Sequence, residues 1–365
     1  MTISTRALSR LSLTDFRSHA STQLQLAGGL VAISGANGAG KTNLLESVSL
    51  LSPGRGLRRA ALGEMAREEG AGGFAIAATL ATGTDVPIEI GTGVEAESAR
   101  RIVRINGANH AATDLTEWVS VLWLTPAMDR LFTGPAGDRR RFLDRLTLAL
   151  HPGHAQAATR YETAMRERNR LIADGRTSDG WLGAAEMQMA EFGALVSGAR
   201  AMAVRSLSGA LVAQDGPFPS ARIAMDGDVW SEADALVAAL SSSRPRDIRA
   251  GRTLVGPHRD DLIVVHAEKG QPAARASTGE QKALLLGIVL AHARLVAEET
   301  GRRPVLLLDE VAAHLDEGRR AALFGLLHGL GSQVWMTGTD ASLFRAIPEG
   351  GTYIDMVDGA PVLRG

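Results

Sequence analysis

Residues 30–42 read Leu30-Val-Ala-Ile-Ser-Gly-Ala-Asn-Gly-Ala-Gly-Lys-Thr42, and this stretch decides the fold. Its first part, Leu30 to Ser34, is a short run of branched apolar residues that predicts a buried strand. Its second part, Gly35 to Thr42, has the pattern G-x-x-x-x-G-K-T of a P-loop. The segment 43–51 has helical periodicity, so strand, glycine loop and helix follow one another as a phosphate-binding loop requires.

The residue types in this loop suit phosphate chemistry. Glycines allow successive backbone N–H groups to point into one concavity, which side chains would obstruct. Lys41 supplies a positive charge for the β- and γ-phosphates, and the Thr42 hydroxyl is placed to ligate Mg²⁺. We therefore expect ATP and Mg²⁺ as ligands, and the nucleotide-binding residues are Gly35, Ala36, Asn37, Gly38, Ala39, Gly40, Lys41 and Thr42.

The composition narrows the class of protein. The 365 residues suffice for one large or two modest domains. The first residues lack the apolar core of a signal peptide, and no run approaches ~18 apolar residues, so we expect a cytoplasmic protein with no membrane association. With no cysteine, the chain has no disulfide, thiol nucleophile or cysteine-bound metal. The net charge of −1 provides no global basic field to indicate nucleic acid.

The pattern of apolar residues changes along the chain. Residues 7–15 alternate like an exposed edge strand, and 73–80, 86–90 and 101–105 predict an antiparallel layer with a hairpin turn at Asn106-Gly107. Another strand is expected at 118–124. From residue 127 helical periodicity takes over, with one helix opening at Asp138 and others at 154–173 and 182–213. The apolar positions of the last helix include Met187, Leu195, Val196, Met202 and Leu207.

These patterns predict an α/β fold with an antiparallel β-layer and a helical arm. The expected bounds are 1–126 for the first part of the nucleotide-binding domain, 127–250 for the arm, and 251–365 for the second part. A 30-residue helix is only about 45 Å long, so the arm is short and is not a long coiled coil.

A second acidic motif completes the expected ATP site. Val305 to Leu308 is an apolar strand that delivers Asp309 and Glu310 at its carboxyl end, the end that faces the ligand in α/β sheets. Asp309 is predicted to hold Mg²⁺, directly or through water. Glu310 is predicted to be the catalytic general base that polarises the attacking water.

Between these motifs lies Ser277-Thr-Gly-Glu-Gln-Lys282, which opens an apolar helix running to about Glu299. Ser277 and Gly279 fit a helix N-cap, with Glu280 in the first turn. The same helix end could also be a second anion site, which would suit two protomers that share ATP head-to-tail. Both interpretations remain open at the level of sequence.

Several of these stretches resemble ABC-type ATPases. Ser277-Thr-Gly-Glu-Gln281 resembles their S-x-G-x-Q signature, and Ala312-Ala-His-Leu-Asp316 resembles their D-loop. The resemblance implies that Ser277, Gly279, Glu280 and Gln281 contact the nucleotide of a partner protomer and that Asp316 serves the D-loop. Thr337-Gly-Thr339 stands where the family has a switch histidine, and Thr125-Pro126 where it often has the Q-loop glutamine, so neither role is assigned.

Within that superfamily the chain is similar to the RecF family of DNA replication and repair proteins. The matching stretches are Leu13 to Arg17, Gly35 to Glu46, Arg139 to Asp144, Gly256-Pro-His-Arg-Asp-Asp-Leu262 and Ser277 to Leu284. The resemblance implies an ABC-type ATPase head with a mixed sheet, built from both chain ends, with the helical arm inserted and with Arg17 near the nucleotide. It also implies an ATP-induced homodimer that clamps DNA at gaps or junctions, works with RecO and RecR in recombinase loading, and is released by slow DNA-dependent hydrolysis.

Two questions stay open. The segment from Gly256 to Asp261 has a pattern that indicates no mechanistic role, and a tight turn with buried salt bridges is the plainer interpretation. DNA contacts are expected among arginines, although the loop 54–59 could equally be a solvated loop. The candidates are Arg55, Arg58, Arg59, Arg139, Arg140 and Arg141.

Other functions are weaker fits to the sequence. The long insertion and Gly-Glu-Gln disfavour a transporter ATPase, the short arm disfavours a long-armed SMC protein, and the absence of cysteine zinc sites disfavours an excision-repair ATPase. A nucleotide-gated scaffold without turnover also remains an alternative, and Asp309-Glu310 argues for turnover.

Overall fold

The computed structural model describes residues 6–82, 86–98, 100–213, 216, 218–313 and 315–364. Contacts divide the chain into two compact units, Met1–Asp129 with Val289–Gly365 (unit 1) and Arg130–Ile288 (unit 2). Unit 1 therefore combines both ends of the chain, and unit 2 is one continuous segment. The divisions fall at 129 and 288, whereas the sequence predicted 126 and 250.

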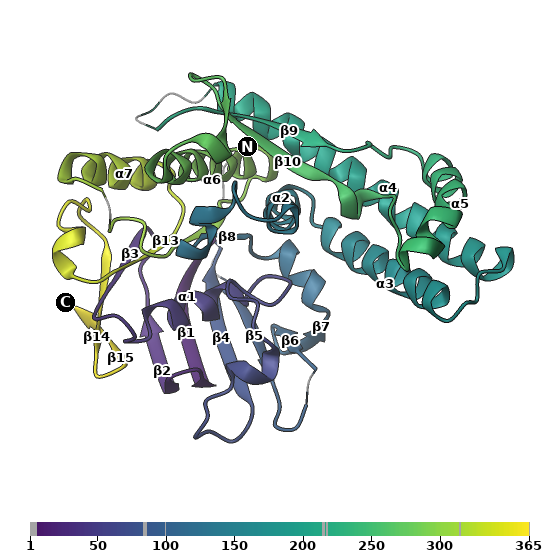
Figure 1. The fold of residues 1–365 in the computed structure, drawn as a ribbon. Helices are drawn as coiled ribbons and strands as arrows, with labels where there is room; N and C mark the ends of the chain where they lie inside the picture. The colour runs from purple at the N-terminus through teal and green to yellow at the C-terminus, as the bar shows by residue number, and fades with distance from the viewer. Residues whose placement is uncertain are drawn as a thin grey trace. The chain divides into compact units, whose positions relative to one another are not determined.

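One sheet of unit 1 is antiparallel, and β2, β1, β4 and β5 lie side by side in it (Figure 1). Its order within the described ranges is β2-β1-β4-β5-β6-β7, with bounds His19–Gln25, Ala7–Phe16, Phe74–Ala81, Ile88–Val94, Ile102–Ile105 and Ala108–His110. The predicted antiparallel layer is confirmed. Asn106 and Gly107 both have positive φ, 48° and 82°, as a two-residue type I′ hairpin requires.

The prediction that residues 7–15 form an edge strand is wrong. β1 pairs with β2 on one side and with β4 on the other, so Leu11 lies between Leu24 and Ala78. Alternation of apolar and polar residues shows that one face of a strand is solvated. It carries no information on whether the two hydrogen-bonding edges are paired.

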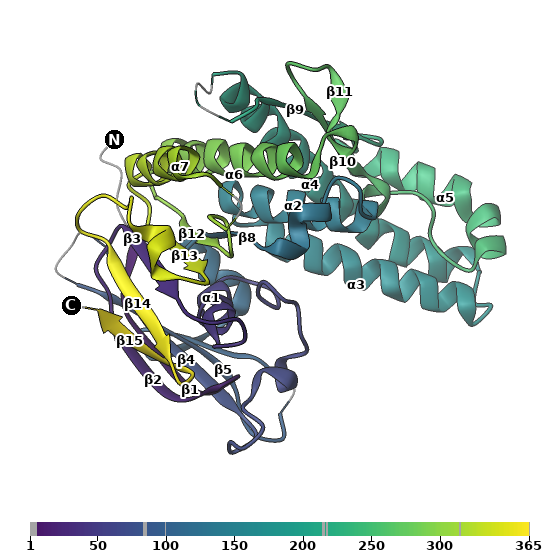
Figure 2. The ribbon, with the colours of Figure 1, turned by 60° about the vertical axis from the view of Figure 1, so that its left-hand side comes forward.

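The other sheet of unit 1 is mixed, and Figure 2 shows the β14–β15 hairpin beside β3. β3, β13, β12 and β8 run parallel, β14 joins β3 in parallel, and β15 is antiparallel to β14. In the described part its order is β15-β14-β3-β13-β12-β8, with bounds Ala360–Arg364, Thr352–Val357, Leu30–Ser34, Val334–Gly338, Val305–Leu308 and Val121–Leu124. The predicted strands at 30–34 and 305–308 are confirmed.

The helix α1 (Lys41–Ser49) shares one core with both sheets. Leu44 and Val48 of α1 belong to the same buried cluster as Ile33 of the mixed sheet and Leu11 and Ile76 of the antiparallel sheet. The helix that follows the P-loop is thus fixed by apolar packing on both sides. The mixed sheet also carries α7 (Glu317–Gly329) between β12 and β13.

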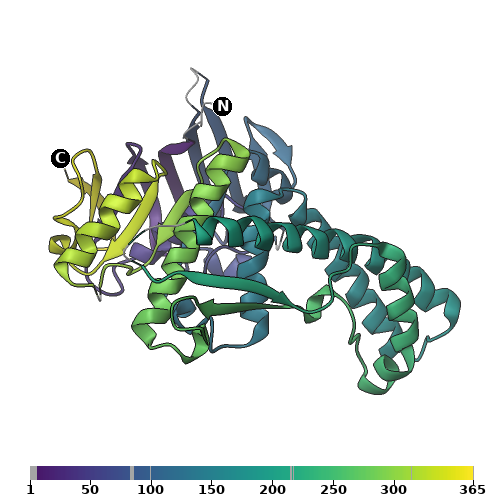
Figure 3. The same ribbon diagram turned by 90° about the horizontal axis from the view of Figure 1, so that it is seen from above.

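Unit 2 contains helices packed side by side, drawn in teal and green in Figure 3. α3 and α4 correspond to the helices expected at 154–173 and 182–213 and pack against each other, and α4 also packs against α2 and α5. Val196 and Leu207 of α4 are buried as expected, but Met187, Leu195 and Met202 are 61%, 57% and 49% exposed. The helices are α2 (Ala136–Leu150), α3 (His154–Ala173), α4 (Asp179–Val212) and α5 (Ala233–Ala250), and α6 (Thr278–Thr300) runs on into unit 1.

A buried ionic network ties α3, α4 and α5 together. Arg168 of α3 is completely buried and pairs with Glu186 of α4 at 3.0 Å and with Asp247 of α5 at 2.8 Å. Arg244 adds a second guanidinium to Glu186 at 2.6 Å. Because one missing partner would leave a buried charge uncompensated, this network specifies one arrangement of the three helices.

Unit 2 also contains a sheet, although the sequence predicts helices from residue 127 to residue 250. β10 (Asp261–His266) lies between β11 (Gln271–Pro272) and β9 (Ala221–Asp226). β10 lies after the predicted end of the arm at residue 250, but its partner β9 belongs to the inserted segment, which explains why the compact unit extends to Ile288. Short 3-10 helices lie at Leu62–Met65 (η1), Ala112–Glu117 (η2), Pro126–Arg130 (η3), Pro257–Arg259 (η4), Ala273–Arg275 (η5) and Ala341–Phe344 (η6). Over the described ranges, none of the helices has the length and apolarity needed to cross a membrane.

Candidate nucleotide-binding site

The P-loop connects β3 to α1, and its glycines adopt conformations that other residues avoid. Gly38 and Gly40 have φ of 81° and 95°. A Cβ at Gly40 would lie 3.0 Å from the Ser18 hydroxyl oxygen, and one at Gly35 would lie 2.7 Å from Met356 Cβ. The loop therefore closes tightly against β14 and the β1–β2 turn only because these positions carry no side chain.

Lys41 spans the loop with its ammonium group. Nζ donates to the carbonyl of Gly35 at 2.6 Å and to that of Ala36 at 2.9 Å. Burial lowers the pKa of Lys41, and the carboxylates of Glu310 and Asp309 oppose this shift. The charge is therefore held beside the two acidic residues that the sequence assigns to the same site.

The acidic motif and the P-loop meet in space although they are far apart in sequence. β3, β13 and β12 are neighbouring parallel strands, so their carboxyl ends share one edge of the sheet. The Thr42 hydroxyl lies 3.1 Å from Asp309 Oδ2 and 3.2 Å from Oδ1. A hydroxyl beside a carboxylate is the oxygen donor set that Mg²⁺ takes alongside nucleotide phosphates. The residues present thus fit a Mg²⁺–nucleotide complex.

Thr337, at the end of β13, belongs to the stretch at the switch-histidine position, and the sequence assigned it no role in the site. Its hydroxyl donates to Asp309 Oδ1 at 2.6 Å and accepts from the backbone N–H of Glu310 at 2.9 Å. The signal that could have found it is a hydroxyl at the end of an otherwise apolar strand next to the acidic one. Thr339, two residues further along the same stretch, is exposed.

Arg17 belongs to a charge cluster around Glu46 on α1. Its guanidinium binds both Glu46 oxygens, at 2.8 and 2.9 Å, and donates to the Glu64 carbonyl. Arg58 reaches the same carboxylate at 2.9 Å and donates to Asn43. A contact between Arg17 and the nucleotide would require its pair with Glu46 to open, and that role stays a prediction.

The basic loop after α1 is anchored from the antiparallel sheet. Arg101 donates to the carbonyls of Leu50, Ser52 and Gly54, and its pKa is lowered by burial to about 10. The structure thus holds the base of the loop and leaves Arg55 and Arg59 exposed. Neither of these two has an ion-pair partner among the described residues, in contrast to Arg58.

The signature segment forms the N-terminus of α6, in unit 2. Ser277 and Glu280 form a capping box, because Glu280 N–H donates to Ser277 Oγ at 3.4 Å and Ser277 N–H donates to Glu280 Oε2 at 2.9 Å. Hydrogen bonds from Lys269 and Ser277 hold the pKa of Glu280 at about 2. Gln281 donates to the Ala276 carbonyl at 2.8 Å. The N-cap interpretation is therefore confirmed, and action on a partner's nucleotide stays a proposal.

The Gly256–Asp261 motif is a tight turn with internal charge pairs, in agreement with the plainer interpretation. Gly256 has φ of 123°, and His258 accepts from the Tyr161 hydroxyl at 2.7 Å through Nδ1. Burial lowers the pKa of His258 to about 4, so the ring is neutral and can accept this bond. Asp260 pairs with Arg200 of α4 at 3.3 Å.

The three arginines of α2 that were candidates for DNA have internal partners. Arg139 binds both oxygens of Asp261, at 2.8 and 2.6 Å, and Arg140 donates at 2.8 Å to the carbonyl of the residue before Asp261. Arg141 pairs with Asp138 one turn earlier. This bonding argues against Arg139 as a DNA contact. Arg139 instead stabilises the turn at Gly256–Asp261.

The D-loop residue Asp316 caps α7. Its Oδ1 accepts from the backbone N–H of Arg319 at 2.8 Å, which is an ordinary N-cap bond. His314, in the same predicted D-loop, lies outside the described residues. A role for Asp316 at a dimer interface stays a prediction.

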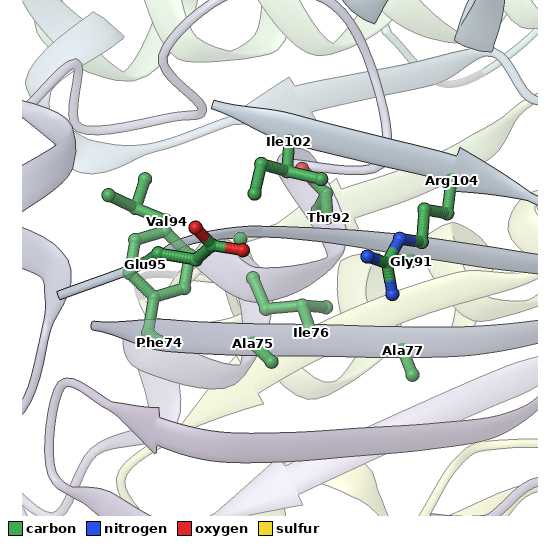
Figure 4. A pocket seen from close by; sticks show the side chains of 11 residues that line it. Phe74, Ala75, Ile76, Ala77, Gly91, Thr92, Val94, Glu95, Ile102 and Arg104 are labelled. Carbon is green, nitrogen blue, oxygen red and sulfur yellow. The ribbon is translucent and has the colours of Figure 1, made fainter. Parts of the chain in front are cut away.

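A hollow of about 230 Å³ lies on the antiparallel sheet and is lined by residues of β4, β5 and β6 and by Glu95 (Figure 4). Its floor includes Ala75, Ala77 and Gly91, and Glu95 and Arg104 stand at opposite ends. The charged groups do not converge, and no P-loop or acidic-motif residue lines it. The hollow therefore provides no rival catalytic centre.

Known proteins are similar in sequence to this chain over nearly its whole length. The profile of the RecF/RecN/SMC N-terminal domain matches residues 7–353. A protein of Mesorhizobium japonicum named DNA replication and repair protein RecF is 56% identical over 355 residues, covering 93% of each chain. A protein of Rhizobium etli with the same name is 52% identical and covers 97% of this chain and 98% of its own.

Solved structures show the same fold. A structure described as the recombination mediator protein RecF-ATP in the RecFOR pathway matches with a TM-score of 0.84 at 22% identity, over 99% of this chain and 100% of that one. The Smc head domain with a coiled coil and joint from Pyrococcus yayanosii matches with a TM-score of 0.57 at 14% identity, over 99% and 97%. The predicted fold class, an ABC-type ATPase head, is confirmed.

Proposed function

The chain belongs to the RecF family of the RecF/RecN/SMC proteins, and we propose that it is an ATP-dependent DNA clamp of replication and recombinational repair, acting in the cytoplasm. The observation that carries this proposal is the contact of the Thr42 hydroxyl with Asp309, which joins the P-loop to the acidic motif. The names of the relatives support a role in DNA replication and repair, and the geometry of the site supports the use of ATP in that role.

Different residues of unit 1 would bind the phosphates of ATP, hold Mg²⁺ and activate the attacking water. Lys41 would exchange its two carbonyl partners for the β- and γ-phosphates, and the P-loop N–H groups would line the same concavity. Thr42 and Asp309 would hold Mg²⁺, which when bound neutralises charge on the phosphate oxygens. Glu310 would accept the proton of the attacking water at its carboxylate. Hydrolysis on this scheme is slow and is stimulated by DNA.

The N-terminus of α6 is the feature from which we infer a dimer. It is a helix N-terminus with a capping box, so its dipole favours an anion. We infer that each protomer places Ser277 and Gly279 against the γ-phosphate of its partner, with Glu280 and Gln281 fixing the turn. ATP would then join two protomers head-to-tail, and hydrolysis would separate them.

Joining two protomers would also bring two sets of arginines to one DNA duplex. Such a dimer would allow a chain with net charge −1 to bind a polyanion. Gapped or junction DNA is the proposed ligand, and RecO- and RecR-type mediators are the proposed protein partners in recombinase loading.

The test is the molar mass in solution, measured by light scattering with and without ATP and gapped duplex DNA. The wild type should double its mass with ATP, and Glu310→Gln should retain dimer and DNA longest because it removes the base but leaves the binding residues. Ser277→Arg should still bind ATP but should remain monomeric. A mass that does not respond to ATP, or a Ser277→Arg protein that dimerises, would refute the head-to-tail dimer.

A further inference from the structure

We propose that Thr337 is a positioning residue that uses one hydroxyl group to orient both acidic residues of the ATP site. The inference rests on the proposed function and concerns the same site. It assigns a role to the end of β13, where no switch histidine is present and where the sequence assigned none.

Thr337 is completely buried, and its hydroxyl makes two hydrogen bonds within the site. It has a single hydrogen, which it donates to Asp309 Oδ1 at 2.6 Å, so the bond from the Glu310 N–H at 2.9 Å must be accepted by its lone pair. Serine could make the same two bonds. Valine has nearly the same shape and can make neither.

Glu310 needs such a restraint because its backbone is strained. Its φ is 54°, in the left-handed region that residues other than glycine rarely adopt. Residues in this region persist only where their surroundings hold them. The bond from the Glu310 N–H to Thr337 is one such restraint, and it sets the direction in which the carboxylate of the general base leaves the chain.

Thr337 also restrains the carboxylate of Asp309. Its carboxylate contacts two hydroxyls, those of Thr42 and Thr337. The Thr42 contacts are long, at 3.1 and 3.2 Å, and Thr42 is itself an expected ligand of the metal. Thr337 makes the shorter bond, at 2.6 Å, and is not among the expected ligands. It can therefore hold the carboxylate before and after Mg²⁺–ATP enters.

Outer partners of metal ligands typically change metal affinity or activity by 10–100-fold when they are removed. We therefore expect Thr337→Val to need ~10–100-fold more Mg²⁺ for half-maximal binding of a fluorescent, non-hydrolysable ATP analogue, with binding measured in a Mg²⁺ titration. Its DNA-stimulated kcat should fall by a similar factor. Analogue binding in EDTA, which reports the P-loop alone, should be unchanged.

Three further variants isolate the hydroxyl. Thr337→Ser keeps both hydrogen bonds and should restore the wild-type Mg²⁺ requirement. Thr337→Ala repeats the loss of the hydroxyl should the valine variant fail to fold. Thr116→Val is the matched control, because Thr116 is also buried in unit 1 but its hydroxyl donates only to the Thr113 carbonyl, at 2.8 Å.

The outcomes separate this inference from the proposed function. A wild-type Mg²⁺ requirement in Thr337→Val, or serine and valine variants that are equally impaired, would overturn the role of the hydroxyl. If the wild type binds the analogue with Mg²⁺ but never hydrolyses ATP, turnover as proposed fails. The Mg²⁺ titration would then decide the role of Thr337 by itself.

Discussion

Replacing Glu46 by glutamine would test whether the charge cluster beside the P-loop stabilises unit 1. The Glu46 side chain is fully buried on α1 and accepts three guanidinium hydrogen bonds, two from Arg17 and one from Arg58. Glutamine has the same size. Its NH₂ group would, however, face guanidinium N–H groups with no acceptor between them.

The two arginines should contribute unequally to the free energy of unfolding. The Arg58 side chain is 41% exposed and can turn to water, so its pair resembles a surface ion pair, worth ~0–1 kcal/mol. The Arg17 side chain is only 19% exposed, and removing one partner of a buried pair costs ~3–5 kcal/mol. Arg17 keeps the Glu64 carbonyl in the variant. We therefore expect the low end, about 3 kcal/mol, for Glu46→Gln.

Hydrogen exchange followed by mass spectrometry is the suitable assay, because it reads the opening of α1 separately from that of unit 2. Arg17→Met should match Glu46→Gln, and Arg58→Met should cost about 0.5 kcal/mol. In thermal unfolding, a unit of 150–250 residues shifts by roughly 2–4 °C per kcal/mol, so Glu46→Gln should lower the transition by about 6–12 °C. A cost below about 1 kcal/mol, or equal costs for the two arginine variants, would refute the reasoning.

Two more predictions concern unit 2 and DNA. Burial alone would raise the pKa of Asp144, but Arg200 and His154 outweigh it and hold that pKa at about 2. The folded-state pKa is below the unfolded one, so Asp144 stabilises unit 2 above about pH 4. As the pH falls towards 2, about 2 kcal/mol of stability is lost. Acid titrations of unfolding should show this loss in the wild type and not in Asp144→Asn, and equal slopes would contradict it. Arg55→Gln with Arg59→Gln should weaken DNA binding and reduce the salt-dependence slope by ~2 while leaving ATP affinity unchanged, and an unchanged slope would exclude phosphate contacts.

The parts of the fold that the sequence predicts are those that a short window encodes. The P-loop needs glycines at positive φ between an apolar strand and a helix, and all of these lie within residues 30–51. The helix at 154–173 follows from its own periodicity. The position of Asp309 and Glu310 at the end of β12 is predictable because a four-residue apolar run directly precedes them.

The features that the sequence missed depend on pairing between distant segments. The pattern of β1 predicts an edge strand because nothing in residues 7–15 encodes its second neighbour, β4. β9 lies in a short alternating stretch and is fixed by its pairing with β10. Thr337 acquires its role only because β13 lies between β3 and β12. A local pattern cannot reveal such a role, since the partners are 27 and 28 residues away.

The same limit explains why counting arginines ranks DNA contacts poorly. A guanidinium has five N–H donors, so an ion pair blocks phosphate binding only when the remaining nitrogens are also bonded. Arg139 is in this state, because Nε and Nη2 bind Asp261 and Nη1 donates to the Gly134 carbonyl, and binding a phosphate would leave Asp261 uncompensated. Arg58 makes its bonds through Nη1, and Arg17 still neutralises Glu46 after Arg58 leaves. Arg55 and Arg59 have no described ion pair to open. The structure therefore orders the candidates as Arg55 and Arg59 first, Arg58 next and Arg139 last, an order that no property of the residue type itself contains.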